Sequence, residues 1–259
     1  AAVLRAMGAP RPYADSRPLA IETVTLDPPG RDEVLVRIRA AGLCHSDLSV
    51  INGDRPRPMP MALGHEAAGE VEAVGEGVHD LRTGDRVVMV FMPSCGHCAP
   101  CAGGRPALCE PGAAANGRGE LLAGGRRLHA GEEALNHHLG CSAFAERAVV
   151  SRRSLVKVPD DLPFEQAALF GRAVLTGVGA VVNTARVRPG QAVAVVGLGG
   201  VGLAALLGAL AVGASPVVAV DLSEDKLALA RSLGPVRTVN AADADAVEKV
   251  RALIGGGAE

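Results

Sequence analysis

The stretch "QAVAVVGLGGVGLAALLGALAVG", residues 191–213, decides the fold class of this chain. It begins with a short apolar run typical of a buried strand, and residues 201–213 are apolar on all sides, as expected of a buried helix. Between them, Gly197, Gly199 and Gly202 have the spacing G-x-G-x-x-G. The first of these glycines allows a tight turn, the second a close approach of pyrophosphate to the backbone, and the third close packing of the helix on the strand. The pattern predicts a dinucleotide-binding loop, and an ordinary glycine-rich turn is the alternative.

A second apolar run, "PVVAVD" (216–221), predicts another buried strand that ends in Asp221. A carboxylate at this strand end accepts hydrogen bonds from ribose hydroxyls and repels a 2′-phosphate, which favours NAD over NADP. An amphipathic helix (223–234), a short strand (236–240) and a charged helix from about Asp243 follow. Alternating strands and helices form parallel sheets, so we predict an α/β domain with about three of the six strands of a doubly wound sheet.

The part of the chain before this domain is predicted to be rich in β-strands. Apolar and polar residues alternate, or follow a Gly-Asp turn, in the segments 32–44, 66–75 and 84–91. The pair Gly124-Gly125 in "ELLAGGRRLHA" predicts the turn of a hairpin. We therefore expect a β-rich domain over residues 1–157, followed by the α/β domain over residues 158–259.

Composition excludes several classes of partner. The net charge of −2 gives no basic field for nucleic acid or an anionic membrane. We expect no apolar, turn-free stretch long enough to span a bilayer, and the first residues do not have the layout of a secretory signal. These features predict a cytoplasmic location, where structural disulfides are rare, so the six cysteines are interpreted as thiols or metal ligands.

Four of the cysteines lie within one short segment, 95–109. Their spacing is C-x2-C-x2-C-x7-C, formed by Cys95, Cys98, Cys101 and Cys109. Four thiolates this close together can form a tetrahedral shell around one Zn²⁺. Such a closed shell has no open position for a substrate, so it would stabilise the loop and perform no reaction. The alternatives are free buried cysteines and an iron–sulfur cluster.

A second set of possible ligands is more dispersed. Cys44 and His45 come just after a predicted strand, and His65 and Glu66 come just before another. A thiol, an imidazole and a carboxylate at strand ends can meet on one side of a sheet and bind a metal. Taken alone, each of these residues has an ordinary structural interpretation.

Together these segments resemble the zinc-dependent alcohol dehydrogenases of the medium-chain dehydrogenase/reductase superfamily. The motifs "CHSD", "GHEAAGEVEAVGEGV", "GDRVV", the four-cysteine lobe, "LTGVGA" and "GLGGVG" occur in the family's order along essentially the whole chain. The resemblance implies a GroES-like catalytic domain (1–157) with a structural-zinc lobe (95–109), and the N-terminal part of a Rossmann NAD-binding domain (158–259). It also implies NAD-dependent oxidation of a primary or secondary alcohol to an aldehyde or ketone, in a homo-oligomer.

The resemblance also implies roles for single residues near a catalytic zinc. Cys44 and His65 would be metal ligands, and Glu66 would be a carboxylate close to the metal. Asp47 resembles the acceptor that orients His65, and Ser46 resembles the hydroxyl that takes the alcohol proton.

Around the cofactor, the resemblance implies contacts from both ends of the chain. Zinc would stabilise the alkoxide while a hydride passes to the nicotinamide. The implied cofactor contacts are His45 near the pyrophosphate, Thr176 near the nicotinamide, and Gly197, Gly199, Gly200, Val201, Gly202, Asp221 and Lys226 on the adenosine side.

The chain departs from the family's pattern at two positions. The third catalytic zinc ligand of the family is a cysteine before "LTG", where this chain has Arg172. A guanidinium has no lone pair to donate to a metal. Arg172 therefore either pairs with Glu66, Asp47 or the Cys44 thiolate in place of the metal, or turns away from a weaker site of Cys44, His65 and Glu66, or marks a copy that has lost catalysis. The remaining alternative is that Arg172 does not occupy the ligand position and lies on a surface. Ser49 stands where many relatives have a proton-relay histidine.

Two other function classes remain as alternatives. One is a non-catalytic homologue that keeps only the structural zinc, or a subunit that pairs with longer copies. The other is a zinc-free, quinone-reductase-like oxidoreductase of the same superfamily. The four-cysteine lobe and Asp221 argue against the second, because such relatives usually lack the lobe and prefer NADPH.

Overall fold

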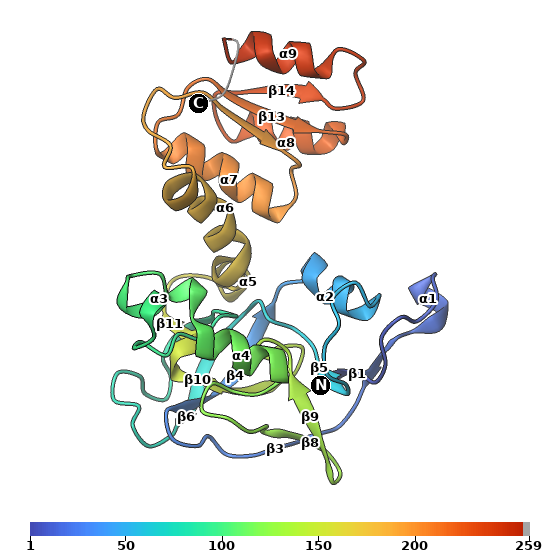
Figure 1. The fold of residues 1–259 in the computed structure, drawn as a ribbon, viewed down its shortest axis with the longest axis vertical. Coiled ribbons are helices and arrows are strands. Elements are labelled where there is room, and N and C mark those ends of the chain that lie inside the picture. Colours follow the sequence, from blue (N-terminus) through green and yellow to red (C-terminus); the bar gives the residue numbers. More distant parts are fainter. Residues whose placement is uncertain (256–259) are drawn as a thin grey trace. The chain divides into compact units, whose positions relative to one another are not determined.

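The computed structural model describes residues 1–255, and the chain forms two compact units, Ala1–Gly171 and the segment from Arg172 onward (Figure 1). This division comes later than the predicted boundary at 157/158. The reason is that α5 (Phe164–Leu169) packs through Ala167 and Ala168 against the sheet of the first unit, beside Ala68 and Val88.

Two antiparallel or mixed sheets form the first unit. The first has the spatial order β2 (Leu19–Ile21), β1 (Ala2–Leu4), β5 (Met61–Ala62), β9 (Glu133–His137), β8 (Leu128–Ala130) and β3 (Thr25–Leu26). The second has the order β10 (Arg147–Ser151), β4 (Glu33–Ala41), β6 (Ala67–Val74), β7 (Arg86–Met89) and β11 (Leu155–Lys157). The helices and helical turns of the first unit are α1 (Tyr13–Ser16), α2 (His45–Ile51), α3 (Ala99–Ala102), η1 (Pro106–Leu108), α4 (Glu110–Arg118), η2 (Arg152–Ser154) and α5.

The three predicted strands are present as β4, β6 and β7, and the predicted alternation of buried and exposed residues is clear on β4. On β4, Val34 and Val36 are buried in the core while Arg37 is exposed, as one face of a sheet requires. β4 pairs with β6 in antiparallel register, with irregularities between Leu35 and Val36 and between Ile38 and Ala40. These local bends lie in the strand that leads to Cys44, and they add twist to the sheet near the end of β4.

The predicted hairpin turn at Gly124-Gly125 is wrong in its position. Gly124 and Gly125 have positive φ angles, but they form a turn that ends before β8 begins. In this turn Leu121 N–H donates to Gly125 O (3.1 Å). The hairpin itself is the pair β8–β9, and its turn lies at Gly131, which also has a positive φ. Glycines occur at both turns, so glycine alone did not distinguish them.

The second unit is the predicted parallel sheet. Its strands β12 (Val193–Val196), β13 (Val217–Asp221) and β14 (Val236–Asn240) pair in this order, all parallel. The helical elements are η3 (Phe170–Val174, which begins at the end of the first unit), α6 (Leu175–Gly179), η4 (Ala180–Thr184), α7 (Gly200–Ala211), α8 (Glu224–Ser232) and α9 (Ala246–Leu253).

Helices cover both faces of this sheet (Figure 1). On β13, Val217 and Ala219 pack with α7 and α8, whereas Val218 and Val220 pack with α9. This alternation explains why the strand reads as continuously apolar. The prediction that α7 is buried all round is only partly correct, because Leu207 on this helix is 47% exposed.

In the part of the chain that the structure describes, one helical segment, Phe164–Thr184, is long and apolar enough to cross a membrane. The expectation that the chain has no such stretch was therefore wrong. A core helix passes the same test of length and composition; 33% of the apolar window of this segment is buried, and the segment packs closely at two glycines, one in each unit. A Cβ at Gly171 would lie 1.9 Å from Met89 O, and one at Gly177 would lie 2.3 Å from Val201 O. Such close backbone packing is typical of a helix inside folded domains.

Candidate metal and cofactor sites

The first candidate site is built on the N-terminus of α2. Cys44 precedes this helix in an extended conformation, and its N–H donates to Asp47 Oδ2 (3.2 Å). In return, Ser46 N–H donates to Cys44 Sγ (3.4 Å). These capping contacts hold the Cys44 thiol and the Asp47 carboxylate at the same end of the helix.

His65 joins this site from the loop between β5 and β6. Its Nδ1 lies 3.2 Å from Asp47 Oδ1, which also accepts a hydrogen bond from Gly64 N–H (3.3 Å). The ring is 1% exposed, and its Nε2 is buried without a hydrogen-bond partner among the described residues. Burial alone would lower the pKa of His65, but Asp47 and Cys44 outweigh it and raise the pKa to about 9. An imidazole held at Nδ1 with Nε2 unsatisfied fits a metal ligand.

A further histidine shares the same carboxylate and was missed by the sequence analysis. His138 follows β9, is 1% exposed, and places Nδ1 3.2 Å from Asp47 Oδ1. The rings of His65 and His138 meet edge to face with centroids 5.0 Å apart. Burial would raise the pKa of Asp47, but its bonds with His138 and His65 hold that pKa well below its usual range. The pair "HH" at a strand end was the available signal.

The remaining predicted residues of this site also lie in the first unit. Glu66 is buried, and its carboxyl group lies against Gly42, where a Cβ would come within 3.0 Å of Glu66 Cδ. Ser49 Oγ donates to His45 O (3.0 Å) and lies 3.4 Å from His45 Nδ1. The structure thus gathers Cys44, Asp47 and His65, with Glu66 close in sequence and buried.

The four-cysteine lobe is the second candidate metal site. The sulfur atoms of Cys95, Cys98, Cys101 and Cys109 all lie within 4.8 Å of one another. Backbone N–H groups point at them: Cys98 N donates to Cys95 Sγ (3.3 Å), and Cys95 N and Gly112 N donate to Cys109 Sγ (3.2 and 3.3 Å). These donors favour thiolates, and the four sulfurs fit a tetrahedral zinc shell.

The surroundings of the lobe cysteines shift the pKa values of their thiols in different directions. The amide groups of His97 and Cys98 lower the pKa of Cys95 to about 6, against the opposing effect of burial. Burial raises the pKa of Cys101 to about 12. A bound cation would favour the thiolate form of all four cysteines.

In the second unit, the glycine-rich loop has the shape that its sequence predicts. Gly197 has a φ of +88°, and a Cβ at Gly202 would lie 1.8 Å from Gly197 O. At Gly199, which caps α7, a Cβ would meet nothing within 4 Å. The first and third glycines are therefore required by the fold, while the second leaves open space at a helix N-terminus, where a phosphate is favoured.

Asp221 lies at the carboxyl end of β13, as predicted, and contacts the same loop. Its Oδ2 accepts a hydrogen bond from Leu198 N (2.6 Å), and its Oδ1 accepts one from Ser223 N (2.9 Å). The Leu198 N–H is the main reason that the pKa of Asp221 is lowered. Lys226 Nζ lies 3.7 Å from Asp221 Oδ2. The sequence analysis did not foresee that this carboxylate fixes the loop.

The last two predicted positions belong to the helical segment before β12. Arg172 lies in the π-helical turn η3, directly after the closely packed Gly171, and begins the second unit. Thr176 lies in α6 and is exposed.

Comparison with known proteins agrees with this architecture. The family model described as "Alcohol dehydrogenase GroES-like domain" matches residues 30–160, and the model described as "Zinc-binding dehydrogenase" matches residues 200–259. The two matches define the class as a zinc-binding dehydrogenase with a GroES-like domain.

Individual relatives narrow this class. The chain is 41% identical over 230 residues to an S-(hydroxymethyl)glutathione dehydrogenase of Synechocystis, covering 88% of the chain and 62% of the relative. It is 44% identical to a geraniol dehydrogenase of Castellaniella defragrans, covering 100% of the chain and 67% of the relative. The crystal structure of an alcohol dehydrogenase zinc-binding domain protein from Burkholderia ambifaria superposes with a TM-score of 0.91 at 42% identity, covering 100% of the chain and 68% of that structure.

The chain belongs to the zinc-dependent alcohol dehydrogenase family of the medium-chain dehydrogenase/reductase superfamily. It spans about two thirds of the length of these relatives, and 62% of the Synechocystis protein. The resemblance found in the sequence and the predicted fold class are confirmed.

Proposed function

We propose that this chain carries the catalytic domain and the adenosine side of the cofactor site of an alcohol dehydrogenase that oxidises a primary or secondary alcohol with NAD. The observation that carries this proposal is the arrangement of His65. Its Nδ1 is held by Asp47, and its buried Nε2 has no hydrogen-bond partner among the described residues. A buried nitrogen without a hydrogen-bond partner is costly, and a bound metal ion would satisfy it. The relative named for geraniol, an alcohol, supports the substrate class.

The metal would be held by Cys44 and His65, with Glu66 as a carboxylate nearby. When bound, zinc supplies a Lewis acid for the alcohol oxygen and NAD accepts the hydride. In the neutral ring that binds a metal, Asp47 would hold the His65 proton on Nδ1 and leave the lone pair of Nε2 for the metal. Because Cys44 and Asp47 belong to the same capped helix end, one local structure positions both the ligand and the residue that orients the other ligand.

The alcohol proton would leave through polar side chains of α2. Ser46 is the hydroxyl proposed to accept it. Ser49 replaces the histidine of many relatives, but its Oγ lies 3.4 Å from His45 Nδ1. His45 is therefore the titratable neighbour that can pass the proton to solvent, in addition to its proposed place near the pyrophosphate.

In the second unit, the loop of Gly197, Gly199, Gly200, Val201 and Gly202 would bind the pyrophosphate of NAD. The open space at Gly199 supports this proposal. Asp221 would accept hydrogen bonds from the ribose hydroxyls and exclude NADP by charge, and Lys226 lies beside it. Thr176 is proposed to contact the nicotinamide.

The four-cysteine lobe is proposed to hold a structural zinc. The N–H groups directed at Cys95 and Cys109 and the short distances among the four sulfurs support this proposal. A homo-oligomeric state and a cytoplasmic location are proposed from the family alone.

Arg172 favours a second candidate function. If this residue takes the place of the third metal ligand, its cation opposes Zn²⁺: at about 4 Å the repulsion costs several kcal/mol even at an effective dielectric constant near 20. The chain would then be a homologue that keeps the structural zinc and binds nucleotide without oxidising alcohols.

Reduction of NAD by the purified chain, assayed with a panel of primary and secondary alcohols, separates the two candidates. We expect turnover that His65→Asn abolishes, whereas His129→Asn, which changes an exposed pair with Asp27, leaves turnover intact. If zinc and NAD both bind and no alcohol is oxidised, the second candidate is correct.

A further inference from the structure

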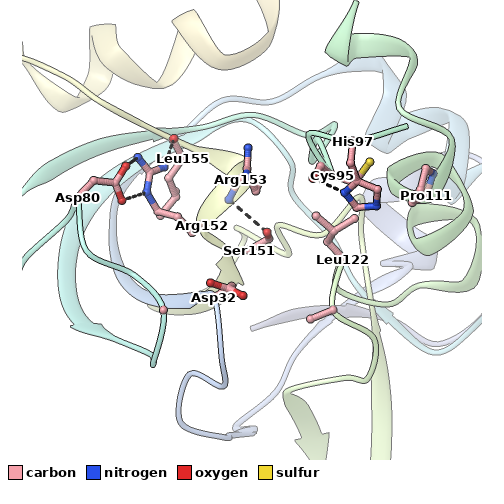
Figure 2. Close-up of a pocket in the computed structure, with 12 residues that line it drawn as sticks. Asp32, Asp80, Cys95, His97, Pro111, Leu122, Ser151, Arg152, Arg153 and Leu155 are labelled. Atoms are coloured by element: carbon pink, nitrogen blue, oxygen red, sulfur yellow. Dashed lines mark hydrogen bonds and ion pairs between the residues drawn. The ribbon is translucent and has the colours of Figure 1, made fainter. Parts of the chain in front are cut away.

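A pocket of about 860 Å³ lies beside the four-cysteine lobe, inside the first unit (Figure 2). Loops around Asp32 and Asp80, the lobe itself, and the turn η2 line it. Of the four lobe cysteines, Cys95 is the one among its lining residues, whereas Cys109 is fully buried. Figure 2 shows Cys95 and His97 at one end of the pocket and the Arg152–Asp80 pair at the other, with Arg153 between them. A small molecule in this pocket can therefore approach the lobe at Cys95.

The two arginines of the pocket differ in what they bind. Arg152 donates to both carboxylate oxygens of Asp80 (2.7 and 2.5 Å) and to Leu155 O (2.7 Å). Arg153 forms no ion pair with any residue in the described part of the chain, and its side chain is exposed. The charge of Arg152 is neutralised by Asp80, so Arg153 provides the available positive charge.

Arg153 is also held next to Cys95. Its guanidinium lies against Gly96, the residue after Cys95: a Cβ there would come within 3.0 Å of Arg153 Nη1. Gly96 has a φ of +84°, so a larger residue would be strained as well as obstructed. Asp32 also lines the pocket, and its carboxylate lies 3.8 Å from Arg31 Nε. At the end of the pocket near the lobe, the guanidinium of Arg153 is therefore the group available to bind an anion.

We propose that the lobe releases its metal through this pocket, to a small anionic ligand that carries a carboxylate or thiolate donor. The proposal rests on the structural zinc proposed for the lobe. The anion binds the guanidinium of Arg153, and Cys95 is the first thiolate to be replaced. If zinc fills the lobe, the step would be a ligand exchange without electron transfer: Cys95 would leave the metal as a thiolate while the incoming donor takes its place.

Among the three lobe cysteines that are half-buried, Cys95 is the one that lines the pocket, and this supports the order. Cys109 is buried, and its sulfur accepts hydrogen bonds from Cys95 N–H and Gly112 N–H. Cys98 and Cys101 do not line the pocket. An attacking donor that enters through the pocket therefore meets Cys95 before any other lobe sulfur.

Zinc release from the full, zinc-loaded chain tests the proposal with two chelators, anionic EDTA and neutral 1,10-phenanthroline. We expect Arg153→Ala to slow release to EDTA by up to about fivefold, the upper limit for one exposed ion pair, and to leave release to phenanthroline unchanged. Arg153→Lys should keep most of the rate. The EDTA effect should shrink as salt rises. Arg105→Ala, an exposed arginine of the lobe outside the pocket, is the matched control and should change neither rate.

Equal slowing with both chelators, or no slowing with either, would overturn the proposal, because the charge of Arg153 would then not guide the ligand. Zinc content measured before chelation keeps this outcome separate from a failure of the proposed function. A chain without zinc in the lobe would refute the structural zinc itself, and the exchange site with it.

Discussion

Replacement of Asp47 should disrupt the first metal site more than any other single change to a residue that is not itself a ligand. The carboxylate accepts hydrogen bonds from Cys44 N–H and Gly64 N–H and lies 3.2 Å from the Nδ1 atoms of both His65 and His138. Asp47→Ala leaves these buried donors without an acceptor. Asp47→Asn keeps the shape but removes the charge.

The structure sets the expected magnitude. Each buried donor left without a partner costs about 1–3 kcal/mol. With partial relaxation, Asp47→Ala should lower the free energy of unfolding by about 3–5 kcal/mol, the range measured for broken buried ion pairs. Asp47→Asn should cost about 1–3 kcal/mol, since its amide oxygen still accepts some of these bonds. Because Asp47 orients His65, zinc affinity at this site should fall about 10- to 100-fold in both variants.

Urea unfolding followed by tyrosine fluorescence measures the stability of the first unit directly. The chain has a single tyrosine and no tryptophan, and Tyr13 packs against the core cluster that contains Val50 and Ile51 of α2. Asp80→Ala, which removes an exposed carboxylate paired with Arg152, is the control and should cost less than about 1 kcal/mol. If Asp47→Ala costs no more than Asp80→Ala, the buried network is not what positions His65.

Four further substitutions test the glycine-rich loop and Asp221. Gly202→Ala places a Cβ 1.8 Å from Gly197 O, so it should destabilise the loop and weaken NAD binding, measured by calorimetry, at least tenfold. The Cβ of Gly199→Ala meets nothing within 4 Å, so this variant should be as stable as wild type but bind NAD more weakly. Asp221→Gly should weaken NAD binding more than NADP binding, and equal losses would show that Asp221 does not contact the ribose. Because the folded pKa of Asp221 is lowered, its stabilisation is present above about pH 4 and lost as pH falls further, so thermal melts of Asp221→Asn and wild type should converge in acid.

Regular patterns in the sequence were sufficient to predict the main elements of the fold. The alternation over residues 32–44 became β4, and the apolar run before Asp221 became β13 with helices on both faces. The position of the hairpin turn was not predictable in the same way, because glycines with positive φ occur at Gly124 and Gly125 as well as at Gly131. Cross-strand pairing selects between such turns, and it depends on residues distant in sequence.

The functional sites, too, were predictable where their residues lie close together in the sequence, and were missed where they depend on pairing between distant strands. The cysteine spacing and the glycine spacing are local, and both lead directly to clusters in space. His138 was missed because it reaches Asp47 only through the pairing of β5 with β9, which joins segments far apart in the chain. The hydrogen bond from Leu198 N–H to Asp221 was also missed, since it depends on the register between β12 and β13.

The most direct test of the account is the zinc content per chain of Arg172→Cys compared with that of the double variant Arg172→Cys, Cys44→Ser, by elemental mass spectrometry. The account predicts two zinc ions in Arg172→Cys, one in the lobe and one at Cys44 and His65, and one in the double variant. Wild type, measured beside them, shows whether Arg172 itself excludes the second ion. One zinc ion in both variants would contradict the claim that the cluster of Cys44, Asp47 and His65 is a metal site.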